Sequence, residues 1–174
     1  MRIGFDAKRA VSNNTGLGNY SRDTIRVLSH YFTKNKYFLY TNKYNQNARL
    51  SFVKERKNIF IQQPISIFDK TFTTYWRSKN IVNDLSTNKI DIYHGLSNEL
   101  PMGIEKTEIK TIVTIHDLIF MRLPNLFNCI DRKIYYKKSK SACERANKII
   151  AISKQTKKDI VELLNIPEEK IAVV

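Results

Sequence analysis

The chain has 174 residues, 42% of them hydrophobic, with few glycines and prolines. This length and composition fit one domain with a sizeable core and exclude an intrinsically disordered chain. The formal net charge of +14 predicts attraction to something anionic: nucleic acid, an anionic membrane surface or phosphorylated small molecules. Because the chain is also rich in Lys, Asn and Ile, as an AT-rich genome would make it, the charge alone does not identify the partner.

The sequence gives no sign of export or of a membrane span. No stretch of eighteen apolar residues is present, and the first residues lack the apolar run and cleavage site of a signal peptide. Cys129 and Cys143 fall on one predicted helix, whereas a secreted disulfide framework uses more cysteines at loop positions. We therefore expect a cytoplasmic protein whose two thiols are reduced and buried or half-buried.

Short apolar runs alternate with longer amphipathic stretches along the whole chain. That alternation predicts an α/β fold, a Rossmann-like parallel sheet with helices on both faces. A polar loop is expected at 11–17, after the first strand. The predicted strands are 2–5, 37–41, 58–62, 90–93, 110–115, 148–152 and 171–174. The predicted helices are 18–32, 47–56, 68–85 (with Trp76 and Ile81 on its buried side), 124–146 and 154–165, the last capped by Ser153 and stopped by Pro167.

In such sheets, ligands bind outside the carboxyl ends of the strands, near the point where the strand order reverses. The residues that follow each predicted strand therefore form the candidate site. They are Asp6, the loop Gly16–Gly18, the segment His94–Asn98, the pair His116-Asp117, and Ser153.

The loop Gly16-Leu17-Gly18-Asn19-Tyr20-Ser21 precedes a predicted helix. Two glycines let a ligand approach the backbone closely, and a helix N-terminus offers free N–H groups to an anion. Ser21 replaces the third glycine of the dinucleotide-binding fingerprint, and the loop is about ten residues long instead of a tight turn. These departures disfavour a dinucleotide-dependent oxidoreductase. The alternative is a turn glycine followed by a helix-start glycine, with no ligand.

Histidines follow two predicted strands. His116 could bond a sugar hydroxyl or shuttle a proton, with Asp117 to orient it; alternatively, backbone carbonyls satisfy the imidazole and Asp117 caps a turn. His94, with Ser97, Asn98 and Glu99, forms a polar loop before Pro101 whose hydroxyl, amide and carboxylate groups suit sugar recognition but also suit any exposed loop. No histidine or cysteine pair has metal-ligand spacing, so no metal site is expected.

The segment 132–158 carries ten lysines and arginines against Glu144 alone, with Tyr135 and Tyr136 among them. This pattern could contact anionic lipid headgroups or nucleic acid. The alternative is a solvated helix face in a lysine-rich chain. Because no RNA- or DNA-binding signature accompanies the segment, nucleic acid is the less favoured partner.

Taken together, these stretches resemble family-4 glycosyltransferases of the GT-B fold, especially the bacterial mannosyltransferases in that family. The resemblance covers nearly the whole chain, and its six pieces occur in the family's order. They are Ile3-Gly4-Phe5-Asp6-Ala7-Lys8, Gly16-Leu17-Gly18-Asn19-Tyr20-Ser21, the stretch from Asp91-Ile92-Tyr93-His94 to Pro101, Val113–Leu118, Ala146–Ser153 and Ile166–Val174.

The resemblance implies roles at the matching positions. The Gly16–Tyr20 loop would lie in an interdomain cleft, near the donor diphosphate and the acceptor. His116 would contact the transferred sugar, and Asp117 would shape the cleft wall beside it. Lys8 and Asn19 stand where the family often has arginine, which puts a guanidinium contact to phosphate in doubt at both. Ser153 would shape the same cleft wall. His94, Ser97 and Asn98 are substrate-binding candidates because they follow a predicted strand.

The resemblance also implies the chemistry and the partners. Family members retain anomeric configuration, need no cofactor or essential metal, and use a nucleotide sugar such as GDP-mannose or a UDP-sugar. Residues 1–174 would be the acceptor-side N-terminal domain, and a C-terminal donor-binding domain, absent from this chain, would supply most donor contacts, including a paired-glutamate motif. The acceptor would be a saccharide or lipid-linked saccharide in cell-surface polysaccharide synthesis, with the segment 132–158 resting on the inner face of the cytoplasmic membrane. The alternative is a non-catalytic basic α/β module that binds nucleic acid or other anionic ligands.

Overall fold

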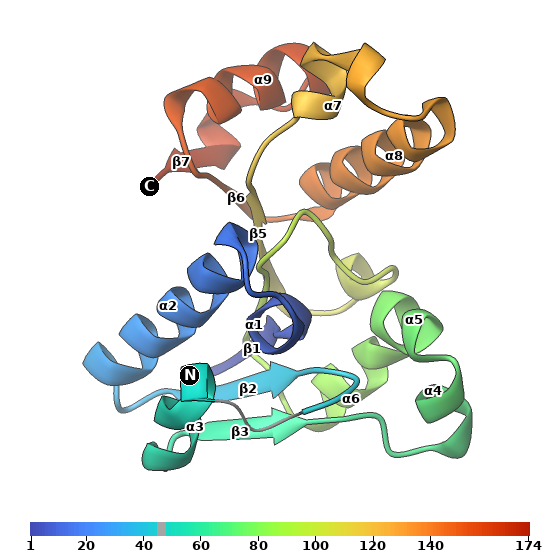
Figure 1. The fold of residues 1–174 in the computed structure, drawn as a ribbon. Helices are drawn as coiled ribbons and strands as arrows, with labels where there is room; N and C mark the ends of the chain where they lie inside the picture. Colours follow the sequence, from blue (N-terminus) through green and yellow to red (C-terminus); the bar gives the residue numbers. More distant parts are fainter. Residues whose placement is uncertain (45–47) are drawn as a thin grey trace.

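The computed structural model describes residues 1–44 and 48–174, and in them one sheet of seven parallel strands (Figure 1). The strand order is β3-β2-β1-β4-β5-β6-β7, so the order reverses between β1 and β4. The predicted α/β fold with a Rossmann-like parallel sheet is confirmed. The strands are β1 (Arg2–Asp6), β2 (Lys36–Tyr40), β3 (Ile59–Gln62), β4 (Ile92–Gly95), β5 (Lys110–Ile115), β6 (Lys148–Ala151) and β7 (Ile171–Val173).

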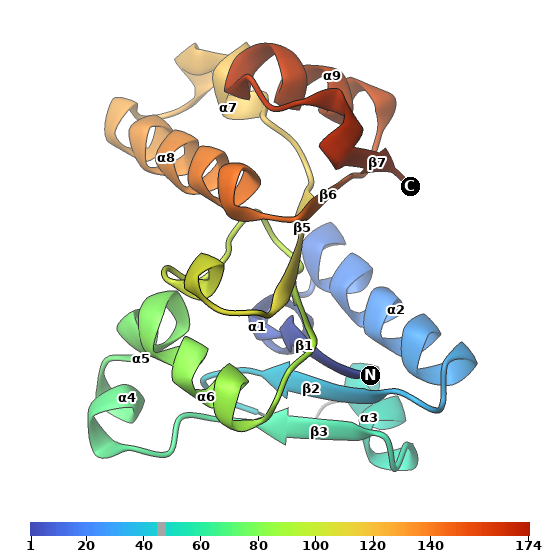
Figure 2. The ribbon, with the colours of Figure 1, turned by 180° about the vertical axis from the view of Figure 1, so that it is seen from behind.

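Helices lie on both sides of the sheet, as the two views in Figures 1 and 2 show. One apolar cluster joins the sheet to α1, α2 and α3, and the other joins it to α6, α8 and α9. The helices are α1 (Lys8–Ser12), α2 (Gly16–Tyr31), α3 (Ser51–Glu55), α4 (Ile67–Thr71), α5 (Thr73–Tyr75), α6 (Ile81–Thr87), α7 (Ile119–Arg122), α8 (Cys129–Arg145) and α9 (Lys154–Leu164).

The central strands are rich in β-branched and aromatic residues, which are buried on both faces of the sheet. In β5, Val113 and Ile115 are fully buried, and in β1 Phe5 is fully buried against the opposite cluster. Phe5 is paired in register with His94 of β4, so the carboxyl ends of β1 and β4 lie side by side. This is the point of reversal at which a ligand site is expected in such sheets.

The helix at the carboxyl end of β6 is confirmed in detail. The Ser153 hydroxyl accepts a hydrogen bond from the Thr156 N–H at 3.0 Å, which satisfies one free donor at the start of α9. The helix ends at Leu164, because Asn165 adopts the left-handed conformation with φ of 54°. Pro167 follows two residues later, where the sequence predicts the stop.

The predicted continuous helix 68–85 is wrong, since the segment is interrupted at Phe72 and its second part contains a π-helical turn. Helices α4 and α5 are followed by η2 (Trp76–Asn80), a π-helical turn, and then by α6. The break is at Phe72, whose ψ of 57° is not helical. The prediction for the buried side holds, because Trp76 and Ile81 are both within 1% of full burial. The π turn widens the helix locally and is a common feature of functional sites.

Three smaller expectations also need correction. Pro124 starts only a 3-10 turn, and α8 begins at Cys129 because the Asn128 side chain accepts the Ile130 N–H there. Cys143 is buried as expected, but Cys129 is exposed, since it occupies the first turn of α8 beyond the sheet. The predicted loop 11–17 is partly helical, because α1 and α2 extend into it.

The predicted helix 47–56 forms over its described part as the 3-10 turn η1 (Ala48–Leu50) and α3. Position 47 lies outside the described residues. Two further 3-10 turns complete the described chain, η3 (Ile104–Lys106) and η5 (Glu168–Lys170). None of the helices in residues 1–44 and 48–174 is long and apolar enough to cross a bilayer.

Candidate active-site cleft and adjoining cationic pocket

Three predicted site residues meet at the carboxyl ends of β4 and β5. The Tyr20 hydroxyl, from α2, forms a hydrogen bond with Thr114 Oγ1 at 3.1 Å, and His94 Nε2 lies 2.8 Å from the same oxygen. The Tyr20 ring also packs edge-on against His116, with ring centroids 4.9 Å apart. Burial, with the added charge of His116, lowers the pKa of His94 to about 4, so this imidazole is neutral at pH 7.

His116 follows β5 and is held in one tautomer. Its Nε2 lies 2.8 Å from the Leu96 carbonyl oxygen. Because a carbonyl only accepts, Nε2 carries the proton and Nδ1 carries the lone pair. Burial and the charge of Arg9 lower the pKa of His116, against the opposing effects of Leu96 and Asp117. The ring is therefore a neutral group with an acceptor at Nδ1.

The Nδ1 atom of His116 forms no hydrogen bond to any residue within 1–44 and 48–174. No buried side-chain nitrogen or oxygen in this part of the chain lacks a partner. Nδ1 is therefore in contact with solvent, although His116 as a whole is only 8% exposed. The arrangement presents a hydrogen-bond acceptor at the carboxyl edge of the sheet.

The two glycines at the start of α2 differ in what they do. A Cβ on Gly18 would lie 1.9 Å from the Asn13 carbonyl oxygen, so tight backbone packing requires glycine there. A Cβ on Gly16 would meet nothing within 4 Å, so packing does not explain that glycine. The Gly18 N–H donates to Asn13 Oδ1 at 3.1 Å, which removes one donor from those available to an anion at this helix end.

Arg22, in the second turn of α2, fixes the loop before the helix. Its guanidinium donates to the carbonyls of Ala10 and Asn13 and to the side-chain oxygen of Asn19. Asn19 is therefore engaged within its own helix. Leu17 is half-buried beside it.

The other predicted residues lie around the same strand ends. Asn98 Oδ1 accepts the His116 N–H at 3.0 Å, which ties the loop after β4 to the end of β5. The Thr156 hydroxyl donates to the His116 carbonyl, so the Ser153–Thr156 cap of α9 also borders this point. Asp117 is exposed and accepts the Ile119 N–H at 3.1 Å, the turn-capping geometry. Ser97 is half-buried beside them.

On the other side of the loop after β4 lies a pocket of about 360 Å³, between the η2 turn and α8. We call it the cationic pocket, because its wall holds five basic side chains and two carboxylates. Its lining residues are Asp6, Lys8, Thr74, Arg77, Ser78, Tyr93, Glu99, Leu100, Pro101, Met102, Lys137, Lys138, Ser141 and Arg145.

A chain of ion pairs organises the floor of the cationic pocket. The Arg77 guanidinium, on the π-helical turn, pairs with Asp6 at the end of β1 and with Glu99 in the loop after β4. Glu99 also accepts from Lys138 Nζ at 2.9 Å. Both carboxylates of the pocket are thus already neutralised by basic groups. Although burial opposes it, the positive charges of Arg77 and Lys138 hold the pKa of Glu99 below its ordinary value.

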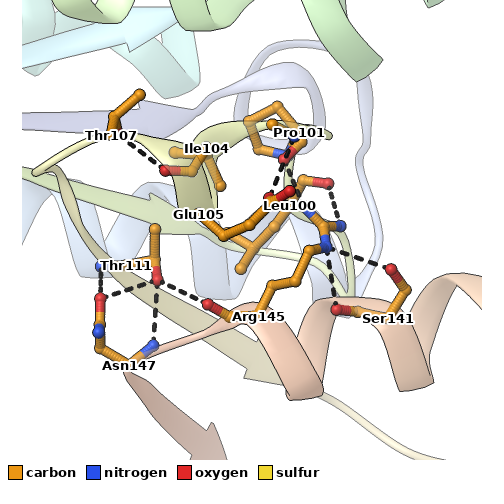
Figure 3. Close-up of polar contacts among 10 residues, drawn as sticks. Leu100, Pro101, Ile104, Glu105, Thr107, Thr111, Ser141, Arg145 and Asn147 are labelled. Carbon is orange, nitrogen blue, oxygen red and sulfur yellow. Dashed lines mark hydrogen bonds and ion pairs between the residues drawn. The ribbon is translucent and has the colours of Figure 1, made fainter.

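Arg145 ties α8 to the loop that closes the pocket (Figure 3). Its guanidinium donates to the carbonyl oxygens of Leu100 and Pro101, and its Nε donates to Ser141 within the helix. Glu105 lies 3.4 Å from it. Most of these partners are uncharged carbonyls, and the positive charge of Arg145 is offset in part by Glu105.

Arg9 and Arg77 carry no sequence signal for the site, and Lys8 stands out in the sequence only as a departure from arginine. Arg9 lies on α1, close enough to both His116 and Lys8 to lower the pKa of each. Asp6, 4% exposed at a strand end, was the signal that could have led to Arg77, because a buried carboxylate needs a basic partner. The sequence could not say which basic residue would supply it.

Several lysines of the basic segment 132–158 form ion pairs with acidic side chains outside it. Besides the Lys138–Glu99 pair, Lys157 pairs with Glu168 at 2.9 Å, and Lys158 lies 3.7 Å from Glu162. Over the described parts of the chain, no group of three or more His, Cys, Asp or Glu side chains could hold a metal ion.

The parallel sheet with its order reversal between β1 and β4 defines an α/β domain of the Rossmann-like class, and a solved structure shares this fold. One such structure is the crystal structure of a glycosyltransferase from Rickettsia africae ESF-5, with a TM-score of 0.56 and 16% sequence identity. The similarity covers 99% of this chain but only 42% of that one. At this identity the likeness concerns the fold.

The model of glycosyltransferase family 4 matches residues 16–174, which is most of the chain. The chain therefore belongs to glycosyltransferase family 4. A search of curated proteins found no match.

Proposed function

We propose that this chain is the acceptor-binding N-terminal domain of a retaining, nucleotide-sugar-dependent hexosyltransferase that acts in cell-surface polysaccharide synthesis. Membership of glycosyltransferase family 4 supports glycosyl transfer as the reaction class. The observation that carries the assignment to a site is His116, a neutral imidazole whose only free nitrogen faces solvent at the carboxyl edge of the sheet.

His116 would act as a hydrogen-bond acceptor for a hydroxyl of the transferred sugar. Its Nε2 proton is committed to Leu96, so Nδ1 is the atom that meets the ligand. A neutral acceptor does not repel the positive charge that develops on a sugar ring during transfer, whereas an imidazolium would. Tyr20 and Asn98 hold the ring and the backbone of His116 in place, which preorganises the contact.

The nucleotide of the donor would be held mainly by a second domain. One observation supports this proposal: the chain spans only 42% of the matched glycosyltransferase. No cofactor or metal is required by the proposed chemistry. We expect the 174-residue chain alone to transfer no sugar from a GDP- or UDP-sugar.

The test uses the native polypeptide purified from its source cells, whose intact mass is measured first. Sugar transfer from a panel of nucleotide sugars is then followed by mass spectrometry of the acceptor. His116→Gln keeps a donor near Nε2 but loses the Nδ1 acceptor, and we expect it to lower kcat/KM about 10- to 100-fold. The exposed His30, on the last turn of α2, gives the matched control His30→Gln.

Two results would contradict the proposal. One is full transferase activity in His116→Gln with normal folding. The other is sugar transfer by the 174-residue chain on its own, which would show that a second domain is not needed to bind the donor.

A further inference from the structure

The side chains that line the cationic pocket are five basic groups and two carboxylates, and Glu105 adds a third carboxylate paired with Arg145, which leaves a formal excess of two positive charges. Asp6 and Glu99 are both paired with Arg77, so neither is free to balance another group. Within 1–44 and 48–174, Lys8 and Lys137 form no ion pair. A concave, partly buried surface of this kind attracts an anion strongly.

Lys8 shows the effect of this excess charge directly. Its side chain is half-buried at the start of α1, and burial, followed by the charges of Arg77 and Arg9, lowers its pKa. The carboxylates of Glu99 and Asp6 oppose this shift but do not cancel it. An anion in the pocket would stabilise the charged form of Lys8.

Exposed apolar side chains lie on α4 and α5, in the same segment as Thr74, which lines the pocket. The rings of Phe68, Phe72 and Tyr75 form one cluster, with centroids 4.9 and 5.9 Å from Phe68, and all three are exposed. Ile65 and Ile67, just before them, are 84% and 85% exposed. An exposed apolar group of this size beside a pocket marks a surface that contacts an apolar phase or partner.

Helix α8, on the opposite side of the pocket, also carries exposed apolar residues next to basic residues that line the pocket. Ile130 and Ile134 are exposed, and residues three or four positions further along the helix lie on the same face. Those positions include Lys137 and Lys138, which line the pocket. In both Figure 1 and Figure 2 the α4–α5 segment and the first turns of α8 lie on the same side of the molecule.

We infer that the cationic pocket binds the phosphate headgroup of a membrane lipid, with the α4–α5 segment and the first turns of α8 resting in the bilayer surface. The lining of the pocket is basic, and the α4–α5 segment and α8, which both contribute to it, carry exposed apolar side chains. This arrangement matches a lipid whose chains stay in the membrane while its phosphate enters the protein. The volume of about 360 Å³ is in the range of small-ligand pockets. A fully hydrated anion would explain the basic lining but not the exposed apolar side chains.

The inference rests on the proposed function in one respect, since it makes the acceptor a lipid-linked phosphate. Glu99 on the pocket floor follows Asn98 directly, and Asn98 bonds the His116 backbone. A headgroup in the pocket would therefore place the rest of an acceptor at the cleft beside His116.

The experiment measures binding of the 174-residue chain to phosphatidylcholine vesicles by co-sedimentation. The vesicles carry either phosphatidic acid, a phosphomonoester, or phosphatidylglycerol, a phosphodiester, at matched surface charge. The pocket variant is Lys8→Gln with Lys137→Gln, and the matched control is Lys34→Gln with Lys110→Gln, two exposed lysines at the amino end of the sheet. A third variant, Ile65→Ser with Ile67→Ser, tests the exposed apolar side chains.

We expect tighter binding to phosphatidic acid than to phosphatidylglycerol, and we expect the pocket variant to lose about fivefold in affinity for each lysine and with it the headgroup preference. The control pair should keep the preference, and the third variant should weaken binding to both lipids. Equal binding to both lipids, or an unchanged preference in the pocket variant, would overturn the inference. So would full competition by millimolar glycerol 3-phosphate, which would indicate a water-soluble phosphate as the ligand.

The two proposals fail separately. If His116→Gln loses sugar transfer but the chain binds both lipids equally, the proposed function stands and the lipid-headgroup site is refuted. If the chain prefers phosphatidic acid but the native polypeptide transfers no sugar, the headgroup site stands and the proposed function is refuted.

Discussion

The guanidinium of Arg77 lies 3.3 Å, from Nε to Oδ2, from the carboxylate of Asp6 at the end of β1. The two side chains are 16% and 5% exposed, so the pair is largely removed from water. Arg77 lies on the π-helical turn η2, and Asp6 lies at the end of β1, so the pair joins two elements far apart in the sequence. A pair in this environment is expensive to break, since the remaining charge stays buried.

Arg77→Leu should therefore lower the free energy of unfolding by about 3 kcal/mol, because it leaves Asp6 and Glu99 without their shared partner. The exposed pair Arg26–Asp23 on α2 supplies the comparison, and Arg26→Leu should cost less than about 0.5 kcal/mol. Urea unfolding followed by circular dichroism measures both. Similar losses in the two variants would mean that the Arg77 pair contributes no more than a surface contact.

The two glycines before α2 should respond differently to alanine. Gly18→Ala places a Cβ on the Asn13 carbonyl and should destabilise the protein by about 2 kcal/mol or more. Gly16→Ala meets open space and should change stability by less than about 1 kcal/mol, in the stabilising direction. Thermal unfolding distinguishes them.

If Gly16→Ala is as stable as the wild type but slows sugar transfer in the native polypeptide, then a ligand, and not packing, requires that glycine. Unchanged transfer would remove Gly16 from the site. Destabilisation by Gly16→Ala would contradict the open surroundings that the structure gives this residue.

The parallel sheet could be predicted from sequence because the patterns that specify its strands and helices each involve only neighbouring residues. The β-branched run of β5 and the Ser153 cap of α9 each act over a few neighbouring residues. The carboxyl ends of the strands then identify a site without any knowledge of side-chain contacts, and Tyr20, His94 and His116 do meet there.

The cationic pocket could not be predicted in the same way, since its parts come from β1, η2, the loop after β4 and α8. The apolar spacing of 68–85 is compatible with one continuous helix. The interruption at Phe72 depends on tertiary contacts that the spacing does not reveal. Trp76 packs in the core and donates its indole N–H to Asp84, while Arg77 turns to Asp6. Such long-range pairs override local helix propensity.

Acid should destabilise the fold through His94. Burial lowers its pKa in the folded state to about 4, whereas an unfolded histidine titrates near 6.5. The unfolded chain therefore binds more protons between these values, and stability is lost as the pH falls from about 6.5 to about 4. The total is about 3 kcal/mol, and the lowered pKa of His116 adds to it in the same direction.

The measurement is the free energy of unfolding in urea at half-unit steps from pH 7.5 to pH 4. His94→Gln, which retains a polar group toward Thr114, should flatten this dependence even if it lowers stability at pH 7. A slope that is the same in both proteins would assign the acid sensitivity to other groups.

The two thiols of α8 should react at very different rates. Cys129 is exposed in the first turn of the helix, whereas Cys143 is fully buried and burial raises its pKa to about 12. At pH 8 only about one Cys143 side chain in ten thousand is the reactive thiolate, and the sheet shields it from reagents. Ellman's reagent should therefore label one thiol quickly in the native protein and the second only after unfolding in urea. Cys129→Ser should abolish the fast phase and Cys143→Ser should leave it intact, so a fast phase that survives in Cys129→Ser would contradict the buried position of Cys143 against the β5–β6 core.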